Sequence, residues 1–241
     1  MQTDYYNRSE ISHSDLMLID KSIEHFLRKG TFDSTDAMDI GRAFHCYILE
    51  REKFDTEFVV KPEGMKFNTK DGKEWQSNNS DRTIIDYDSF KWFELMQKKI
   101  TDHPMNCVLQ GNNIEVEKEI FFEYQDLKCR SKLDYINATK RIIIDFKTIS
   151  DCSKAESEAK WKYSSQAFFY QIACFEEYGE IFDCIFIFAE KSYPHGVKYI
   201  KFTAETLTIG ANKIQNAIDK YKKYLSNPAQ YTGYSETLIE V

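Results

Sequence analysis

Three closely spaced strand-like segments between residues 114 and 149 constrain the fold of this chain more than any other feature. The segment IEVEKEIFFEY (114–124) alternates in polarity, DLK (126–128) provides a turn, and CRSKLDYIN (129–137) and RIIIDFKTI (141–149) follow. Alternation with a period of two and short polar connections predict an antiparallel meander. Helical patterns precede and follow it. The order of elements predicts an α/β fold with a mixed central sheet flanked by helices.

The flanking segments supply the remaining elements of this prediction. A first helix is expected over about 14–28, started by Ser12 or Ser14 and ended by Gly30. Further helices are expected over about 36–51, from Asp88 or Ser89 towards Lys99, from after Ser150 to about Lys160, over about 162–178 and over about 204–226. A strand pair is expected over 182–190 and 197–203, and residues 61–75 are expected to form a mobile basic loop. We expect one domain over residues 1–241, helical to about residue 110, with the core of the fold over about 111–241.

Composition narrows the class of protein. The 241 residues are 42% hydrophobic, enough for a packed core, and the net charge of −7 argues against a protein held on nucleic acid by its overall charge. A bilayer-spanning apolar run and a signal-peptide pattern are both missing, so we expect a soluble cytoplasmic protein without membrane contact. The six cysteines form no C-x-x-C pair and are expected to be reduced thiols rather than zinc ligands.

Two aspartates at the ends of neighbouring predicted strands form a candidate metal site. If residues 137–140 connect the strands, Lys132 lies opposite Asp145 and Asp134 lies opposite Ile143. Asp134 and Asp145 then become diagonal neighbours on one face, where both carboxylates can reach one divalent cation. Oxygen ligands of this kind favour Mg²⁺, with Mn²⁺ expected to substitute.

The sequence from Asp134 to Lys147 resembles the arrangement of PD-(D/E)XK nucleases. In that arrangement an aspartate precedes an apolar strand that ends in D-x-K, here Asp145-Phe146-Lys147. The resemblance implies that the carboxylates hold a metal ion and that Lys147 activates or orients water. A D-x-K tripeptide by itself is more often a surface ion pair, and a Pro-Asp pair before Asp134 is absent.

Further motifs resemble one branch of these nucleases, the exonuclease VIII (RecE-type) domains, which are close to the RecB-type family. The motifs are G-x-x-x-H at Gly41 to His45, T-x-x-G-K at Thr69, Gly72 and Lys73, the strand CRSKLDYI, and Q-x-x-x-Y at Gln166 and Tyr170. The likeness runs from about residue 10 to residue 234 and includes the segment NPAQYTGY. Each motif alone also has an ordinary structural explanation, such as a core histidine or helix packing.

The resemblance implies a role for each site residue. His45, Asp134, Asp145 and the carbonyl of Phe146 are the implied metal ligands, and Lys147 positions water or stabilises developing charge. Gln166 and Tyr170, one helical turn apart, are expected to orient the site lysine or to touch phosphate. Glu119 is either an outer-sphere partner or a solvated strand residue.

Local basic side chains must provide the contacts to DNA in an acidic protein. The candidates are Lys66, Lys70, Lys73, Arg130 and Lys132, and Trp75 or Phe67 could stack on a strand end. Under the simpler interpretation most of these residues are solvated surface charges.

The resemblance implies a metal-dependent exodeoxyribonuclease of phage or bacterial recombination and replication. Such an enzyme digests linear double-stranded DNA from its ends, 5′ to 3′, leaves a 3′ single strand for an annealing protein, and forms a homo-oligomer. One alternative is a RecB-like or Cas4-like nuclease with single-strand preference or other polarity, although the cysteines lack the grouping that an iron–sulfur cluster needs. Another is a protein that binds DNA ends without cutting them.

Overall fold

The computed structural model describes Tyr5, residues 8–30 and residues 36–228. Most of the segment NPAQYTGY, from Ala229 onward, lies outside these residues. A five-stranded sheet has the order β3 (Ile114–Tyr124), β4 (Leu127–Asn137), β5 (Ile142–Ile149), β6 (Asp183–Glu190) and β7 (Val197–Lys201). Neighbouring strands are antiparallel except β5 and β6, which are parallel. The predicted mixed central sheet is confirmed.

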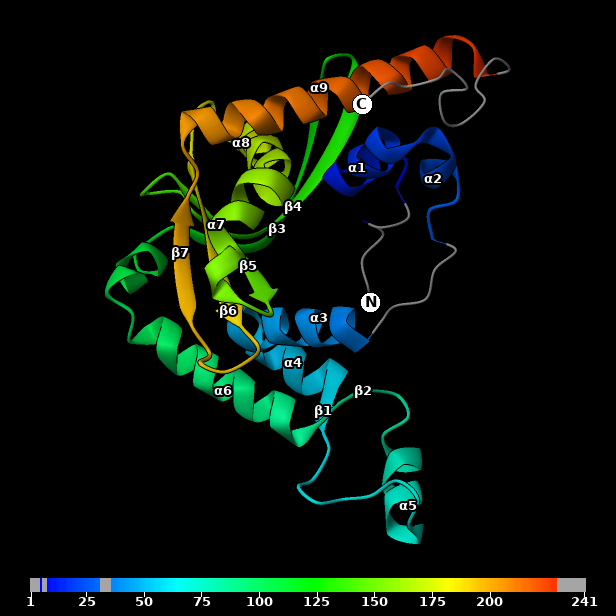
Figure 1. The fold of residues 1–241 in the computed structure, drawn as a ribbon, viewed down its shortest axis with the longest axis vertical. Coiled ribbons are helices and arrows are strands. Elements are labelled where there is room, and N and C mark those ends of the chain that lie inside the picture. The colour runs from blue at the N-terminus through cyan, green and yellow to red at the C-terminus, as the bar shows by residue number, and fades with distance from the viewer. Residues whose placement is uncertain (1–4, 6–7, 31–35, 229–241) are drawn as a thin grey trace.

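Helices cover both faces of the sheet and produce three layers (Figure 1). One layer contains α1 (His13–Lys21), α2 (Ile23–Leu27), α7 (Ala155–Glu158), α8 (Ser164–Tyr178) and α9 (Ala204–Ser226). The opposite layer contains α3 (Asp36–Leu49), α4 (Arg51–Glu57) and α6 (Tyr87–Thr101), with the short parallel pair β1 (Phe58–Val60) and β2 (Thr83–Ile85) beside it. Helix α5 (Lys70–Asn78) projects from this layer (Figure 1).

Strict alternation along β6 separates the two hydrophobic cores. Phe186 and Phe188 point into the core under α8 and α9, whereas Ile185 and Ile187 point into the core under α3 and α6. A strand with apolar residues at every position can be buried on both faces, which explains the continuous apolar run of this segment. The sheet is therefore held from both sides at its centre.

The predicted register between the second and third strands is wrong by two residues. Asn137 pairs with Ile142 and Tyr135 with Ile144, so the connection runs over residues 138–141. The side chain of Asn137 accepts a hydrogen bond from the Lys140 amide, and Arg141 has a φ of 54°. These turn features move the strand start later than the sequence pattern indicates.

Two local predictions need correction. The first helix is broken at Ser22, whose extended backbone ends α1 and whose hydroxyl accepts from the His25 amide to start α2. The predicted loop 61–75 contains the beginning of α5, because Thr69 caps this helix by accepting from the Gly72 amide. A Cβ at Gly72 would lie 2.1 Å from the Lys66 carbonyl oxygen, so the T-x-x-G-K motif has a structural requirement of its own.

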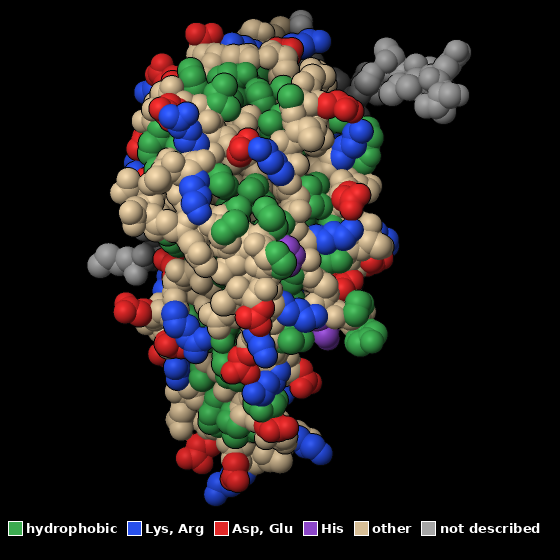
Figure 2. Space-filling model, turned by 90° about the vertical axis from the view of Figure 1, so that its left-hand side faces the viewer, with side chains coloured by type: hydrophobic (Ala, Val, Ile, Leu, Met, Phe, Trp, Pro, Cys, Tyr) green, Lys and Arg blue, Asp and Glu red, His purple; other side chains and the backbone are tan. Residues whose placement is uncertain are grey.

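The charge distribution matches an acidic protein. Figure 2 shows basic and acidic side chains intermixed over the side that carries β7 and α6, without a broad basic field. Within the described residues, the structure contains no helix that is both long enough and apolar enough to span a bilayer. Contacts with a polyanion therefore depend on local features of the surface.

Two glycines inside helices give a test of the helix packing. A Cβ at Gly210 in α9 would lie 2.1 Å from the Ser164 carbonyl oxygen, whereas a Cβ at Gly41 in α3 meets nothing within 4 Å. Gly210→Ala should lower the free energy of unfolding by about 1–3 kcal/mol through overpacking. Gly41→Ala should raise it by about 0.5–1 kcal/mol, since alanine favours the helix. Urea denaturation of both variants measures the two changes, and a stabilised Gly210→Ala protein would contradict this packing.

Candidate functional site

The strands β4 and β5 separate where the candidate site begins. Their ladder ends at the pair Tyr135 and Ile144, although β5 continues beside β6 to Ile149. Beyond that point the Phe146 amide donates to Oδ2 of Asp134 at 3.0 Å instead of to a backbone carbonyl. The Asp134 carboxylate thus satisfies a backbone donor at the opening between the strands.

A change of face in the β3–β4 hairpin accompanies this opening. Val116 and Tyr135 belong to the core under α3 and α6, while Ile120 and Leu133 belong to the core under α8 and α9. Even spacing would keep Val116 and Ile120 on one face of β3, and Leu133 and Tyr135 on one face of β4. Glu117, which lies between Val116 and Ile120, has a φ of 52°, a conformation that is costly for a residue with a side chain. This distortion exchanges the faces of the hairpin next to Asp134.

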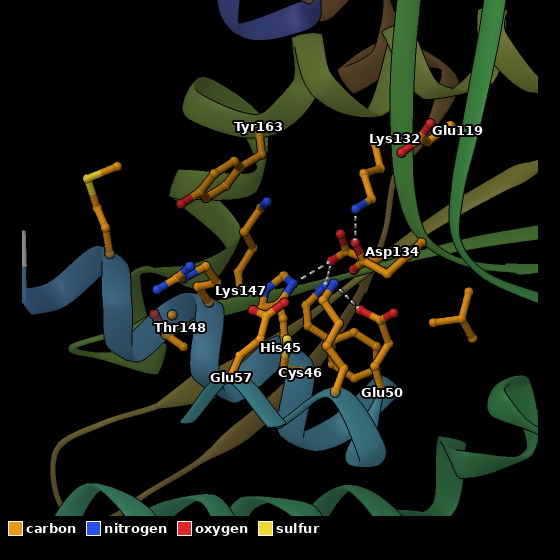
Figure 3. A pocket seen from close by; sticks show the side chains of 17 residues that line it. His45, Cys46, Glu50, Glu57, Glu119, Lys132, Asp134, Lys147, Thr148 and Tyr163 are labelled. Atoms are coloured by element: carbon orange, nitrogen blue, oxygen red, sulfur yellow. Dashed lines mark hydrogen bonds and ion pairs between the residues drawn. The ribbon is translucent and has the colours of Figure 1, made fainter. Parts of the chain in front are cut away.

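His45, Glu117 and Asp134 come together at the distortion. His45 lies on α3, and its Nδ1 lies 3.2 Å from Oδ2 of Asp134. One ligand atom from each of the three residues lies within 4.8 Å of the others, and all three side chains are half-buried. Lys132 forms an ion pair with Oε2 of Glu117 at 2.8 Å. Figure 3 shows His45 beneath Asp134, with Lys132 above it.

A second group of polar residues is centred on Asp145. This carboxylate is 1% exposed, and its Oδ2 lies 2.6 Å from Nζ of Lys147. Its Oδ1 accepts from Nε2 of Gln166 at 3.2 Å and from the hydroxyl of Tyr170 at 3.1 Å. Gln166 Nε2 also lies 2.7 Å from the Tyr170 hydroxyl, so α8 fixes both partners of Asp145.

The two groups meet in a cavity of about 780 Å³ between the helix layers. Lys147 and Tyr163 line one wall, with Nζ of the lysine 5.1 Å from the centre of the tyrosine ring, and Lys132 and Glu119 line the other (Figure 3). Tyr163 ends the π-helical turn Ala159–Tyr163 that precedes α8. Turns of this kind are frequent at functional sites.

The electrostatics of the cavity fit a divalent cation. Burial and the neighbouring Asp145 carboxylate raise the pKa of Asp134 from 3.8 to about 7. A carboxyl group responds in this way when negative charge gathers without enough compensating positive charge. An imidazole nitrogen and two carboxylates are suitable donors for Mg²⁺, Mn²⁺ or Zn²⁺, so the residues present fit a metal ion.

Lys147 carries a positive charge in this environment. Burial alone would lower the pKa of its ammonium group, but Asp145 and Asp134 outweigh that effect and raise it above 10.5. Burial and the Asp145 carboxylate also raise the pKa of Tyr170 well above 10, so its hydroxyl remains a neutral donor. Lys147 is therefore suited to neutralise negative charge and to orient a water molecule, not to accept a proton.

The structure places most of the predicted site residues around this cavity. His45, Asp134, Phe146, Lys147 and Lys132 line it, as does Glu119. Gln166 and Tyr170 reach it through Asp145. Asp145 itself lies outside the cluster of potential ligand atoms, so its role as a metal ligand, like that of the Phe146 carbonyl, stays a prediction.

The predicted DNA-binding residues fall in different places. Lys70 and Lys73 belong to the projecting helix α5, and Lys66 lies in the segment before its cap residue Thr69. Phe67 and Trp75 stack on each other at 6.3 Å between ring centres. Arg130 lines a separate cavity that it shares with Lys132.

Sequence reasoning missed Glu117. In the segment EVEKE every acidic residue resembles part of a solvated strand face, and the pattern indicates Glu119, two residues after Glu117, equally well. No local signal distinguishes the two glutamates, because the left-handed backbone that directs Glu117 into the cavity arises from the hairpin's tertiary surroundings.

This combination of a mixed sheet, an opened strand pair and a D-x-K tripeptide agrees with the family comparison. Residues 12–237 match the family model described as PDDEXK-like domain of unknown function (DUF3799). The chain belongs to this family. The predicted PD-(D/E)XK fold is therefore confirmed, whereas membership of the RecE-type branch stays a prediction. No curated protein matches the sequence significantly.

Two solved structures extend the comparison for this PDDEXK-like chain. A candidate exonuclease from Eubacterium rectale has a TM-score of 0.64 and 14% identity, covering 99% of this chain and 94% of its own. At that identity the likeness concerns the fold alone. A phage-related exonuclease from Haemophilus somnus 129PT has 13% identity, covers 94% of this chain and 99% of its own, and has a TM-score of 0.41, too low to support an argument.

The raised pKa of Asp134 predicts a pH-dependent cost in the metal-free protein. Between pH 3.8 and about 7 the folded protein binds more protons at Asp134 than the unfolded chain, so stability falls as pH rises through this range. Asp134→Asn keeps an oxygen for the Phe146 amide and removes the charge. It should therefore raise the Tm at pH 8 and have a small effect near pH 4, as measured by circular dichroism with a chelator present.

Asp55→Asn is the matched control, since this aspartate is exposed on α4 and forms a surface ion pair with Arg51. Its effect on the Tm should stay small at both pH values. A lower Tm of Asp134→Asn than of the unmodified protein at pH 8 would contradict the electrostatic account.

The Glu117 carboxylate should increase the affinity for a metal ion, while its positive φ should lower the free energy of unfolding. Glu117→Gln should weaken Mn²⁺ binding at least about tenfold in calorimetric titration, because the cluster loses one of its carboxylates. Glu117→Gly should lose the same affinity but exceed Glu117→Ala in unfolding free energy by about 1–2 kcal/mol, since glycine accepts a positive φ.

Glu119→Gln provides the comparison for Glu117, because Glu119 lines the same cavity outside the ligand cluster. It should change Mn²⁺ affinity less than Glu117→Gln does. Equal affinities for Glu117→Gln and the unmodified protein would remove Glu117 from the metal site.

Proposed function

We propose that the chain is a metal-dependent exodeoxyribonuclease that hydrolyses linear double-stranded DNA from its ends, 5′ to 3′. The observation that carries this proposal is the meeting of two groups in one cavity. His45, Glu117 and Asp134 form a donor set for a cation, and Lys147 adds a fixed ammonium group beside Asp145. Phosphodiester hydrolysis requires such an excess of directed positive charge around a phosphoryl group.

A divalent cation held by His45, Glu117 and Asp134 would polarise the phosphoryl oxygens and acidify water. In the reaction a water oxygen forms a bond to phosphorus, the bond from phosphorus to one ester oxygen breaks, and that oxygen takes up a proton. The products are a phosphomonoester and an alcohol. The net charge on the phosphoryl oxygens grows during this change, so cations that are fixed in advance accelerate it.

The protein's own contribution is to position the charged groups. Asp145 holds the ammonium group of Lys147, and α8 holds Asp145 through Gln166 and Tyr170. Lys147 is then directed at a phosphoryl oxygen or a water molecule without loss of side-chain freedom during the reaction. Asp134 is fixed in the same way by the Phe146 amide.

DNA and end-directed polarity enter the proposal through the RecE-type motifs. Gly41 to His45, Gln166 and Tyr170 occupy positions that contribute to the cavity or support it. Helix α5, which carries Lys70 and Lys73, projects away from the body of the protein, where these lysines can contact a duplex (Figure 1). The exonuclease name of the structure from Eubacterium rectale, which has a similar fold, supports a nuclease in general terms.

Paired substrates test the proposal and its alternatives. Linear duplex labelled separately at each terminus should be shortened from its 5′ ends in Mg²⁺ or Mn²⁺ and survive with a chelator, while closed circular duplex should remain intact. Cleavage of circles would reject an exonuclease. Survival of linear duplex, with binding retained, would favour the protein that binds ends without cutting, and preference for single strands would favour the RecB-like alternative.

Lys147→Gln tests the role of the ammonium group. Glutamine can still donate a hydrogen bond to Asp145 but carries no charge, so kcat should fall at least about 100-fold. Lys201→Gln on β7 is the control, since this lysine pairs with Asp183 on the surface. Full activity of a folded Lys147→Gln protein would exclude Lys147 from catalysis.

A further inference from the structure

The ammonium group of Lys147 lies in a corner formed by one carboxylate and two aromatic rings. Its Nζ is 2.6 Å from Oδ2 of Asp145, 5.1 Å from the centre of the Tyr163 ring and 5.3 Å from the centre of the Phe186 ring. The lysine side chain is largely withdrawn from solvent, and a buried ammonium group needs compensation on more than one side. The two rings therefore cover the sides of the ammonium group that Asp145 leaves open.

The two rings have different positions in the fold. Phe186 pairs with Asp145 in the β5–β6 ladder and is fully buried, so it belongs to the core of the sheet. Tyr163 comes from the π-helical turn before α8, is half-buried and lines the main cavity. Figure 3 shows its ring beside the end of the Lys147 side chain. Tyr163 is therefore the ring on the cavity side of the corner, and it can be replaced without removing a fully buried side chain.

Other aromatic residues hold the Tyr163 ring in place. Its centre lies 6.0 Å from the ring centre of Phe186 and 5.8 Å from that of Phe188, and the planes are tilted by 55° and 56°. Tilted aromatic pairs at such separations attract each other. Both phenylalanines belong to β6 and are fully buried. The sheet therefore fixes the orientation of the Tyr163 ring independently of Lys147.

Tyr163 extends the stripe of α8 residues that supports the site. Tyr163, Gln166 and Tyr170 have the spacing i, i+3 and i+7, which places side chains on one face of a helix. Gln166 and Tyr170 donate to Oδ1 of Asp145, and the ring of Tyr163 contacts the ammonium group of Lys147. One helical face thus holds both members of the Asp145–Lys147 ion pair.

An aromatic ring has an electrostatic advantage over another carboxylate at this position. The face of a ring attracts an ammonium group although the ring carries no net charge. Glu117, Asp134 and Asp145 already bring carboxylates to the site. One more carboxylate would repel an anionic phosphodiester, whereas a ring holds Lys147 without weakening the positive charge that the phosphoryl group meets.

We propose that the face of the Tyr163 ring positions the ammonium group of Lys147 in the cavity. This inference rests on the proposed function and adds a positioning residue to it, because Tyr163 acts through Lys147 and not on the DNA. Asp145 and the ring together restrict the rotation of the lysine side chain, so its remaining donor stays directed into the cavity. Without the ring, the ammonium group occupies the productive position for less of the time, which lowers kcat and leaves DNA binding unchanged.

Kinetics on linear duplex separate the ring from the hydroxyl group of Tyr163. Tyr163→Leu should lower kcat at least about fivefold and change KM less than about twofold, whereas Tyr163→Phe keeps the ring and should keep kcat within about twofold. In a Lys147→Gln background, Tyr163→Leu should have no further effect, since the ring acts through the ammonium group. Tyr87→Leu is the matched control, because the Tyr87 ring lies 5.5 Å from Nζ of Lys91 on the outer helix α6, and its kcat should stay unchanged.

Nuclear magnetic resonance tests the contact without any catalysis. In protein labelled with carbon-13 at the lysine ε position, the Lys147 signal is the one that is missing from Lys147→Gln. The ring current of Tyr163 should displace the ε protons of Lys147 upfield, and this displacement should persist in Tyr163→Phe and decrease in Tyr163→Leu. Lys162→Gln should keep it, although this variant removes a second ammonium group that lies 4.9 Å from the centre of the same ring.

The two measurements together decide the role of Tyr163. An unchanged Lys147 signal in a folded Tyr163→Leu protein would overturn the proposal. Equal losses of kcat in Tyr163→Phe and Tyr163→Leu, or an effect confined to KM, would overturn it as well. If no variant and no unmodified protein cuts duplex while Tyr163→Leu still loses the upfield displacement, the proposed nuclease fails and the positioning of Lys147 by Tyr163 stands.

Discussion

The hydrogen bond from the Phe146 amide to the Asp134 carboxylate is the interaction on which the site depends. It replaces the next rung of the β4–β5 ladder, so the strands separate without leaving a buried donor unsatisfied. The separation admits a cavity into the middle of a sheet that is otherwise packed on both faces. The same hydrogen bond fixes Asp134 against His45, which ties the opening of the sheet to the position of a candidate metal ligand.

The site concentrates negative charge and compensates for it only in part. Lys147 balances Asp145, and Lys132 balances Glu117, whereas Asp134 keeps a raised pKa near 7. This arrangement lowers the stability of the folded protein, and the binding of a cation would offset that cost. Strained and electrostatically perturbed groups are common at functional sites for this reason. The left-handed backbone at Glu117 adds a conformational cost at the same place. Both costs concern residues that face the cavity.

Rigid elements from distant parts of the chain surround the opened strands. α3 supplies His45 from one layer, and α8 supplies Gln166 and Tyr170 from the other, so both layers must be packed before the site is complete. A second, smaller cavity lies between the start of α1 and β4. Lys132 lines this cavity as well as the main one.

The sequence by itself determined the meander of strands, most of the long helices and several of the residues around the cavity, because hydrophobic periodicity and short motifs are local properties; it missed β1 and β2 and placed the start of α5 in a loop. Asp134, Asp145, Lys147 and His45 were identified in this way. Tertiary structure alone decided the two-residue shift of register, set by the turn after Asn137, and the inclusion of Glu117, set by a backbone distortion that no residue pattern marks. It also decided that Arg130 is buried beside α1, because the burial of a charge depends on what packs over it and not on its neighbours in sequence.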